Sequence, residues 1–203
     1  MFKRIAKTVL TLGLTGLLTG AALAQTTPPT RIRGTIASLN DRLLTITSRD
    51  GQTLTVTLAE NVTVSAVKKI DLATVGDGAY IGTASRTEAG GQQAIEVLVF
   101  PEAMRGTGEG HFAWDLEPGS MMTNGTVKAA AAKGTGKELT VAYKDSSQTV
   151  TVPANAPVVT LAPAEKADLK PGAPVFLSAM KNAEGQFTAA RVTVGKDGVA
   201  PPM

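Results

Sequence analysis

The segment Met104–Met122 collects the side chains of this sequence that are best suited to chemistry. It holds the only histidine, His111, and the only tryptophan, Trp114, among 203 residues. Charged and sulfur-bearing side chains surround them, namely Arg105, Glu109, Asp115, Glu117, Met104, Met121 and Met122. A linker that only separates two domains is typically built from Gly, Ser and Pro, whereas long structured loops are often functional. The segment is therefore the first candidate site.

Metal binding is one interpretation of this segment. Imidazole and carboxylate groups suit Zn²⁺ or Cu²⁺, and thioethers suit Cu⁺. The candidate ligands are His111, Glu109, Asp115, Met121 and Met122. A single imidazole without a second strong ligand gives a weak site at best. The sequence thus offers, as an alternative function, weak metal handling with copper or zinc as the ion.

Two further interpretations compete with metal binding. In one, the segment contacts a partner or ligand, with Trp114 and Phe112 as anchors and Arg105 as a polar clamp. The contact residues are then Arg105, Glu109, His111, Phe112, Trp114 and Asp115. In the other, the alternating Phe112, Trp114 and Leu116 pin the linker across two domains as shared core. The sequence leaves all three interpretations open.

Signatures of an enzyme are missing from the sequence. The spacing of Gly106, Gly108 and Gly110 does not match a dinucleotide fingerprint, and no Lys-Ser/Thr pair follows it. There is no G-x-S-x-G motif, and any serine–histidine pair would have to use His111. The absence of cysteine excludes disulfides, thiolate catalysis and cysteine ligands. We therefore predict a protein that is not an enzyme, and we assign no catalytic residue.

Apolar and polar residues alternate at the period of a β-strand in ten stretches. Leu54, Val56 and Leu58 share one face, for example, while threonines occupy the other. Turn signals such as Asn40-Asp41 and Asp50-Gly51 separate the stretches. The expected strands are 31–39, 42–48, 53–58, 78–86 and 92–100, then 123–131, 137–144, 147–153, 174–181 and 186–194.

These stretches recur as two copies of one unit. Gly34-Thr35-Ile36 resembles Gly125-Thr126-Val127, and Leu44-Thr45-Ile46 resembles Leu139-Thr140-Val141, at an offset of roughly 91 to 97 residues. Helix-like pieces around Lys68–Thr74 and Ala164–Leu169 fall between the third and fourth strands of each copy. Five strands with a short helical turn at that place indicate a small OB-type barrel, and a β-sandwich half or another small barrel would fit this order nearly as well. The expected fold is all-β, with two tandem five-stranded OB-like barrels.

The division into domains follows from this pattern. We expect one barrel over residues 30–101 and a second over 123–196, joined by a structured linker at 102–122 and followed by a flexible tail at 197–203. A domain of about 70 residues buries only about 60% of its unfolded surface. The two barrels are therefore expected to pack on each other or on a partner.

The pattern "GTI…LTI…DGQTLTV", followed by "FPEAMRGTGEGHFAWDLEPGSMMTNGTV", resembles a family of exported bacterial proteins with no assigned function, built from repeated small OB-like β-barrel domains. The resemblance covers most of the mature chain, and residues 100–127 are its most specific part. Some members are labelled automatically as metal transporter permeases. This sequence argues against that label, because a permease needs several membrane helices.

The N-terminus predicts export. Residues 1–24 have the features of a signal peptide: a basic start, an apolar stretch and the small-x-small sequence Ala22-Leu23-Ala24 before cleavage. Cleavage removes three basic residues and leaves 17 against 17 acidic ones. A neutral, exported chain is a poor partner for nucleic acid, and no later segment is long and apolar enough to span a membrane. We expect a periplasmic or secreted protein.

These observations predict a non-enzymatic binding or interaction module of the bacterial cell envelope. Its partner is expected to be an envelope protein or a small ligand, whose identity the sequence does not give.

Overall fold

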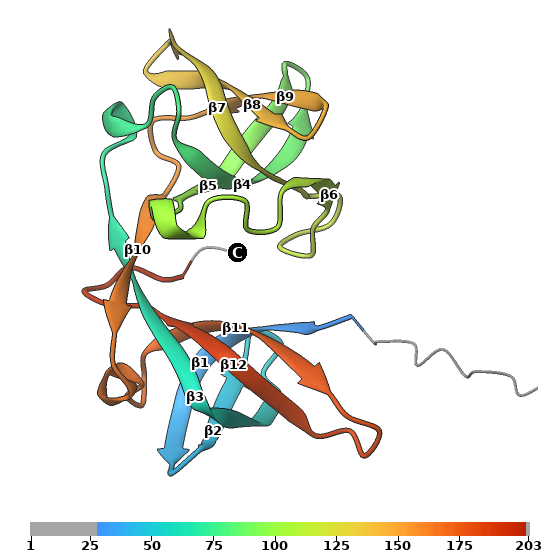
Figure 1. Cartoon of the computed structure of the whole chain (residues 1–203), viewed down its shortest axis with the longest axis vertical. Helices are drawn as coiled ribbons and strands as arrows, with labels where there is room; N and C mark the ends of the chain where they lie inside the picture. Colours follow the sequence, from blue (N-terminus) through green and yellow to red (C-terminus); the bar gives the residue numbers. More distant parts are fainter. Residues whose placement is uncertain (1–27, 202–203) are drawn as a thin grey trace, which may run out of the picture.

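The computed structural model describes residues 28–201, so the predicted signal peptide and the last two residues of the tail lie outside the described part. The described chain is all-β, as the alternation predicted (Figure 1). Its strands are β1 (Thr30–Asn40), β2 (Leu43–Ser48), β3 (Thr53–Lys69), β4 (Tyr80–Glu88), β5 (Gly91–Val99), β6 (Gly110–Ala113), β7 (Met121–Lys133), β8 (Gly136–Tyr143), β9 (Ser146–Val152), β10 (Val158–Ala164), β11 (Pro174–Lys181) and β12 (Phe187–Val194). Three single-turn 3-10 helices are η1 (Leu72–Thr74), η2 (Glu102–Met104) and η3 (Lys166–Asp168).

The strands form where the alternating residues predicted them. Leu44 and Ile46 of β2 are fully buried, as are Val56 and Leu58 of β3, whereas the threonines between them face outward or are half-buried. The turn at Asp41 has a positive φ of 51°, which Asp tolerates better than most residues. The predicted helical turns are confirmed as η1 and η3. Asp71 caps η1 by accepting a hydrogen bond from the backbone N–H of Ala73 at 2.8 Å.

Within residues 28–201 the strands close into two five-stranded barrels. Barrel 1 contains β1, β2, β3, β11 and β12, closed by the antiparallel pair β1–β11 and the parallel pair β12–β3. Barrel 2 contains β4, β5, β7, β8 and β9, closed by the antiparallel pair β4–β7 and the parallel pair β5–β9. In both barrels a three-strand meander is completed by a two-strand hairpin.

This pairing departs from the expected division at residues 30–101 and 123–196. The hairpin β4–β5 follows the first meander in the chain but closes on the second one, and β11–β12 follows the second meander but closes on the first. The physical reason lies in β3, which is 17 residues long. At about 3.3 Å per residue it spans on the order of 55 Å, enough to carry the chain out of barrel 1 and into barrel 2. β10 brings the chain back (Figure 1).

Three strand segments were not predicted from the sequence, and all three lie where the barrels meet. The second half of β3 pairs with β10 in antiparallel fashion, and β10 pairs with β5 in parallel fashion. β6 pairs with the start of β7. The polar residues Glu60 and Asn61 interrupt the alternation within β3. Pro163 within β10 argues against a strand on sequence grounds.

Two glycines at corresponding places in the meanders permit close strand approach. A Cβ on Gly34 of β1 would collide with the carbonyl oxygen of Thr47, and a Cβ on Gly125 of β7 would collide with that of Ala142. A register shift follows a few residues later in each strand, between Ile36 and Ser38 and between Val127 and Ala129. The two environments are those expected of the proposed repeat.

Three hydrophobic clusters hold the described chain together. One fills barrel 1 and one fills barrel 2. The third, which we call the junction cluster, lies between them and consists of Val67, Tyr80, Leu98, Phe100 and Val159. Its members come from β3, β4, the end of β5 and β10, so strands of both barrels share it. The barrels are thus joined by a continuous ladder, β3–β10–β5, and by a packed apolar layer.

Candidate functional site

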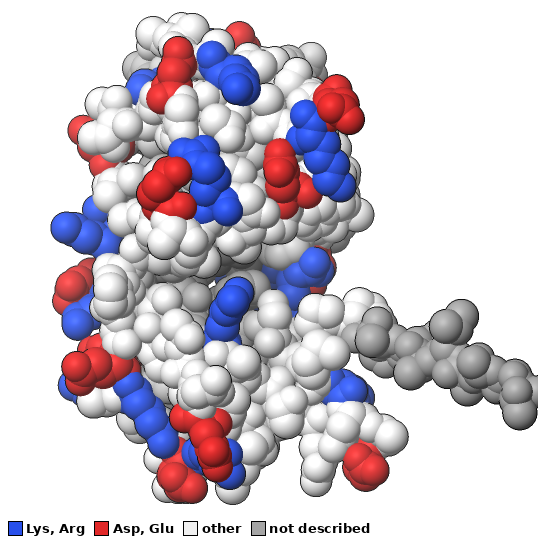
Figure 2. All heavy atoms as spheres, in the orientation of Figure 1, with Lys and Arg blue, Asp and Glu red and all other residues white. Residues whose placement is uncertain are grey.

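A cleft of about 840 Å³ opens beside the junction cluster, between the two barrels. Figure 2 shows the hollow between the two lobes, with basic side chains at its edge and charges of both signs over the rest of this face. The residues that line it are Arg49, Lys69, Ile70, Asp71, Leu72, Glu96, Ala154, Asn155, Ala156, Pro157, Val158, Val159, Gly198, Val199, Ala200 and Pro201. Distant parts of the chain therefore build one site.

Each wall of the cleft is positioned by the strands that join the barrels. Lys69 ends β3, and the backbone N–H of Ile70 donates to the carbonyl of Val158 at 3.0 Å, which holds the start of β10 beside it. Arg49 lies in the turn between β2 and β3 of barrel 1, whereas Glu96 belongs to β5 of barrel 2. The site exists only because the two barrels are held together.

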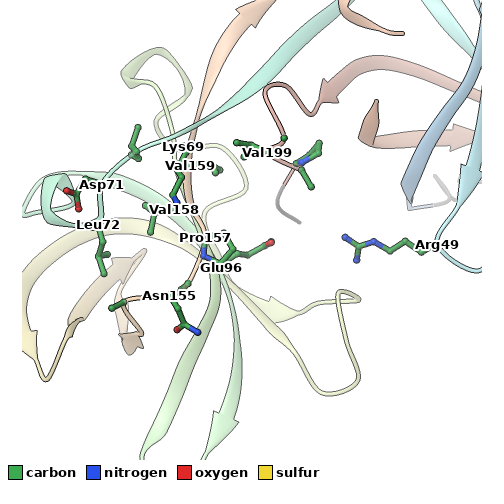
Figure 3. Close-up of a pocket in the computed structure, with 16 residues that line it drawn as sticks. Arg49, Lys69, Asp71, Leu72, Glu96, Asn155, Pro157, Val158, Val159 and Val199 are labelled. Atoms are coloured by element: carbon green, nitrogen blue, oxygen red, sulfur yellow. The ribbon is translucent and has the colours of Figure 1, made fainter. Parts of the chain in front are cut away.

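Charged groups of opposite sign face each other across the cleft. Arg49 and Glu96 extend toward each other from opposite walls (Figure 3). Glu96 is only 8% exposed, whereas Arg49 and Lys69 are exposed. Apolar side chains such as Val158 and Val159 form the wall between them. A concave, largely apolar surface with a few convergent polar groups is the usual form of a ligand site.

The chain's own C-terminal segment lies along this cleft. Asp197 and Gly198 adopt positive φ angles, which turn the chain after β12, and Val199 packs against the junction cluster. Pro201 is buried. Residues 197–201 therefore do not behave as the flexible tail that the sequence predicted. The cleft thus holds a turn followed by the small apolar and proline residues Val199, Ala200 and Pro201.

Two smaller hollows continue the cleft along barrel 1. One, of about 280 Å³, is lined by Arg33, Gly34, Thr35, Thr47, Ser48, Arg49, Pro174, Val175, Ala200 and Pro201. The other, of about 390 Å³, is lined by Thr30, Arg31, Ile32, Arg33, Ser48, Arg49, Asp50, Gln52, Leu54, Asp115 and Leu116. Arg49 borders all three spaces, so they form one groove that passes this side chain.

The linker that the sequence singled out is folded onto both barrels. Its strand β6 pairs with β7 of barrel 2, where His111 lies opposite Thr123. The Nδ1 atom of His111 is 2.9 Å from the hydroxyl of Thr123, and its ring stacks on Tyr143 at 6.0 Å. Phe112 meets Trp114 edge to face at 5.9 Å. These contacts lie within the protein.

The tip of the linker reaches barrel 1 through Trp114 and Asp115. The guanidinium of Arg31 lies 3.8 Å above the Trp114 ring, and Arg33 donates a 2.8 Å hydrogen bond to the Asp115 carboxylate. Burial alone would raise the pKa of Asp115. The hydrogen bond from Arg33 and the charges of Arg33 and Arg31 outweigh this effect, so the pKa lies below its usual value. We call this contact the latch.

The remaining candidates of the linker are engaged as well. Arg105 pairs with Glu102 and donates to the carbonyl of Gly78 at 2.9 Å, which ties η2 to barrel 2. Glu109 accepts a 2.9 Å hydrogen bond from the backbone N–H of Lys144. Burial and the charge of Glu109 raise the pKa of Tyr80. The protonated hydroxyl of Tyr80 donates a 3.1 Å hydrogen bond to the carbonyl oxygen of Thr107.

The proposed metal ligands are not gathered around one point. Asp115 belongs to the latch, Glu109 bonds to the turn after β8, and Met122 is fully buried in β7 opposite Phe112. Met121 is half-buried beside it. Among residues 28–201, no three His, Cys, Asp or Glu side chains form a group that could hold a metal ion.

The residues of the cleft carried no signal in the sequence. Arg49 follows a predicted strand, and Lys69 is the second of two lysines after a valine-containing stretch, as many surface residues are. Glu96 gave the one available clue, since it is a charged residue within the otherwise apolar stretch 94–100. Only the pairing of β3 with β10 and of β10 with β5 brings these side chains together.

Comparison with known proteins adds no assignment. No family model, no curated protein and no solved structure matches this chain. Within the described residues, no helix combines the length and the apolar character needed to cross a membrane. The geometry of the molecule is therefore the basis for its proposed function.

Proposed function

We propose that this protein is a non-enzymatic, exported binding module of the bacterial cell envelope, and that its ligand binds in the cleft between the two barrels. The observation that carries the proposal is the cleft itself, about 840 Å³ of space to which barrel 1, barrel 2 and the C-terminal segment each contribute. Ligand sites typically have volumes of about 300–1,000 Å³ and often lie at domain interfaces.

The lining of the cleft favours a short peptide segment as the ligand. Residues 198–201 already lie there as a chain of small apolar residues and proline. The apolar wall of Val158 and Val159 suits such side chains, and Arg49 and Lys69 provide cationic groups at the edge. This chemistry agrees with an envelope protein as the partner.

The rigidity of the joint supports binding. The ladder β3–β10–β5, the junction cluster and the latch each connect the barrels. A site whose walls are fixed before binding loses less conformational entropy when the ligand arrives. The predicted signal peptide supplies the argument for export.

Two adjacent lysines offer a matched test. Lys69 lines the cleft, whereas its neighbour Lys68 is exposed but does not belong to the lining. A random heptapeptide display library would be selected on the immobilised mature protein, and the enriched peptides would be measured by fluorescence anisotropy. We expect Lys69→Glu to weaken binding about fivefold or more and Lys68→Glu to leave it nearly unchanged, because reversal of a charge at the rim acts locally.

Either of two results would count against the proposal. One is a failure of the library to enrich any peptide. The other is an equal loss of affinity in both variants, which would indicate attraction by net charge in place of a defined cleft.

The alternative function, weak metal handling at His111, has its own test. Cu²⁺ and Zn²⁺ would be titrated into the mature protein while the fluorescence of Trp114 is followed, with His111→Ala as the control. Saturable quenching that disappears in the variant would favour metal handling over peptide binding. The carboxylates of Asp115 and Glu109 are engaged elsewhere, so we expect no such quenching.

A further inference from the structure

Two arginines stand side by side in the groove that continues the cleft. Arg33 of β1 and Arg49 after β2 lie on neighbouring chains, because the backbone N–H of Arg49 donates to the carbonyl of Arg33 at 3.1 Å. The next pair in the ladder is Gly34 opposite Ser48. Side chains at directly opposite positions of antiparallel strands point to the same face. The two guanidinium groups therefore border the same spaces.

Arg33 is fixed in place. Its side chain is only 9% exposed, it lies 5.3 Å from the Phe176 ring centroid, and it donates to Asp115. Its Nε atom is buried and has no hydrogen-bond partner within residues 28–201. A guanidinium held this firmly is already ordered for a second oxygen ligand.

Arg49 is the opposite case. It is exposed, and within residues 28–201 its side chain forms no ion pair, hydrogen bond or ring contact. The positive charge of this side chain is directed into the groove, and it borders all three hollows. An arginine in this position can receive an oxygen ligand without first giving up an internal one.

The hollow of about 280 Å³ between these two arginines is suited to an anion. Among the described residues that line it, there is no carboxylate, and the hydroxyl groups of Thr35 and Thr47 are present as additional donors. Guanidinium groups match the oxygens of carboxylates and phosphates in a planar, bidentate geometry.

The latch shows that a carboxylate fits these arginines. In the neighbouring hollow of about 390 Å³, the Asp115 carboxylate sits 2.8 Å from the Arg33 guanidinium and 3.6 Å from that of Arg31. The hollow of about 390 Å³ thus contains Asp115 and Asp50 beside the arginines, whereas the hollow of about 280 Å³ is lined by Arg33 and Arg49 without a carboxylate among the described residues.

We infer that Arg33 and Arg49, with the hydroxyls of Thr35 and Thr47, form a subsite for a carboxylate or phosphate group. The inference rests on the proposed function, because it assigns an anionic group to the ligand of the cleft. A peptide that lies along residues 198–201 would bring such a group to this point, since Ala200 and Pro201 line both spaces.

The test follows the arginine Nε–H signals by ¹⁵N NMR while inorganic phosphate or triglutamate is added to the mature protein. The variant Arg49→Gln removes a side chain without internal partners, so it is not expected to disturb folding. The matched control is Arg42→Gln, because Arg42 belongs to the same barrel but lies outside all three hollows. Its Nη1 atom lies 3.8 Å from Oε1 of Glu60.

We expect saturable shifts of the Arg33 and Arg49 signals with at least one of the two anions, weakened about tenfold in Arg49→Gln and unchanged in Arg42→Gln. Saturation by phosphate would point to a phosphorylated ligand, and saturation by triglutamate alone to an acidic peptide. Equal losses of anion affinity in both variants, or no saturable shift with either anion, would overturn the subsite.

The failure of the subsite and the failure of the proposed function can be told apart. Selected peptides whose affinity falls in Lys69→Glu but not in Arg49→Gln would refute the subsite alone. Anion binding without any selected peptide would refute the proposed function alone.

Discussion

The linker and the cleft differ in what their side chains contact. The linker holds the rarest residues of the chain, and the structure directs them inward or onto a neighbouring strand: His111 to Thr123, Trp114 to Arg31 and Asp115 to Arg33. The cleft is lined by common residues, yet Arg49 and Lys69 are exposed at its edge. Here the rare residue types therefore lie at a contact between the barrels, and ordinary residues line the accessible cleft.

The comparison also separates two ways of joining domains. The linker fastens the barrels through a small polar latch at its tip. The cleft lies beside the junction cluster, which is apolar and shared by strands of both barrels. Apolar burial contributes roughly 25 cal/mol per Å², whereas partly exposed ion pairs contribute little. The junction cluster is expected to be the stronger of the two joints.

The largest effect is expected from Leu98→Ala in the junction cluster. Leu98 is fully buried, and truncation of a buried leucine costs about 2–5 kcal/mol of unfolding free energy. The measurement is urea unfolding followed by circular dichroism. Leu43→Ala is the control, because Leu43 is 49% exposed and its loss is expected to cost less than about 0.5 kcal/mol. Equal stability of the two variants would contradict a shared core between the barrels.

A smaller, pH-dependent effect is expected from Asp115→Asn in the latch. The fold lowers the pKa of Asp115. The stabilisation that its carboxylate gives to the folded state is therefore present above the usual carboxyl pKa and is lost as the pH falls through the pKa of Asp115 in the folded protein. We expect the variant to be less stable by about 0.5 kcal/mol at neutral pH, because Asp115 is half exposed and solvent screens its interaction with the arginines. This difference should shrink below about pH 4.

Urea titrations at several pH values, with Trp114 fluorescence as the signal, would measure that difference. Glu60→Gln serves as the control, since Glu60 and its partner Arg42 are both exposed. If the difference in unfolding free energy between wild type and Asp115→Asn does not change with pH, the carboxylate charge does not stabilise the latch.

The smallest effect on ligand affinity is expected from His111→Ala in the linker. The variant loses the contact with Thr123 and the stacking on Tyr143. We expect its unfolding free energy to fall by about 0.5–1.5 kcal/mol. Because His111 lies outside the cleft lining, its removal should leave the affinity for selected peptides unchanged. Anisotropy titrations of the variant check this. A clear loss of affinity would place the binding surface on the linker, as the contact interpretation of the sequence had it.

Most of the fold could be predicted from the sequence because strand formation is local. The alternation of Leu44 and Ile46, or of Leu139 and Val141, requires one buried face whichever strands lie beside it. Nine of the ten predicted strands agree with the structure to within a few residues, the tenth gives only the first part of β3, and η1 and η3 lie where helical turns were expected. β6, β10 and the second half of β3 were missed, because Glu60, Asn61 and Pro163 break the local pattern there.

The site could not be predicted in the same way. His111 and Trp114 stood out by rarity alone, and rarity does not reveal whether a side chain is engaged within the fold. Arg49 and Glu96 are 47 positions apart by their residue numbers and belong to different barrels. No local pattern in the sequence connects them.

The sequence by itself determined the all-β class, the order of meander, helical turn and hairpin, and the faces that are buried, since all of these depend on the alternation of neighbouring residues. Only the tertiary structure decided which hairpin closes which meander. Either choice buries the same local faces. The long β3 and the returning β10 favour exchange between the two halves. That exchange creates the shared cleft, whose walls come from residues far apart in the chain.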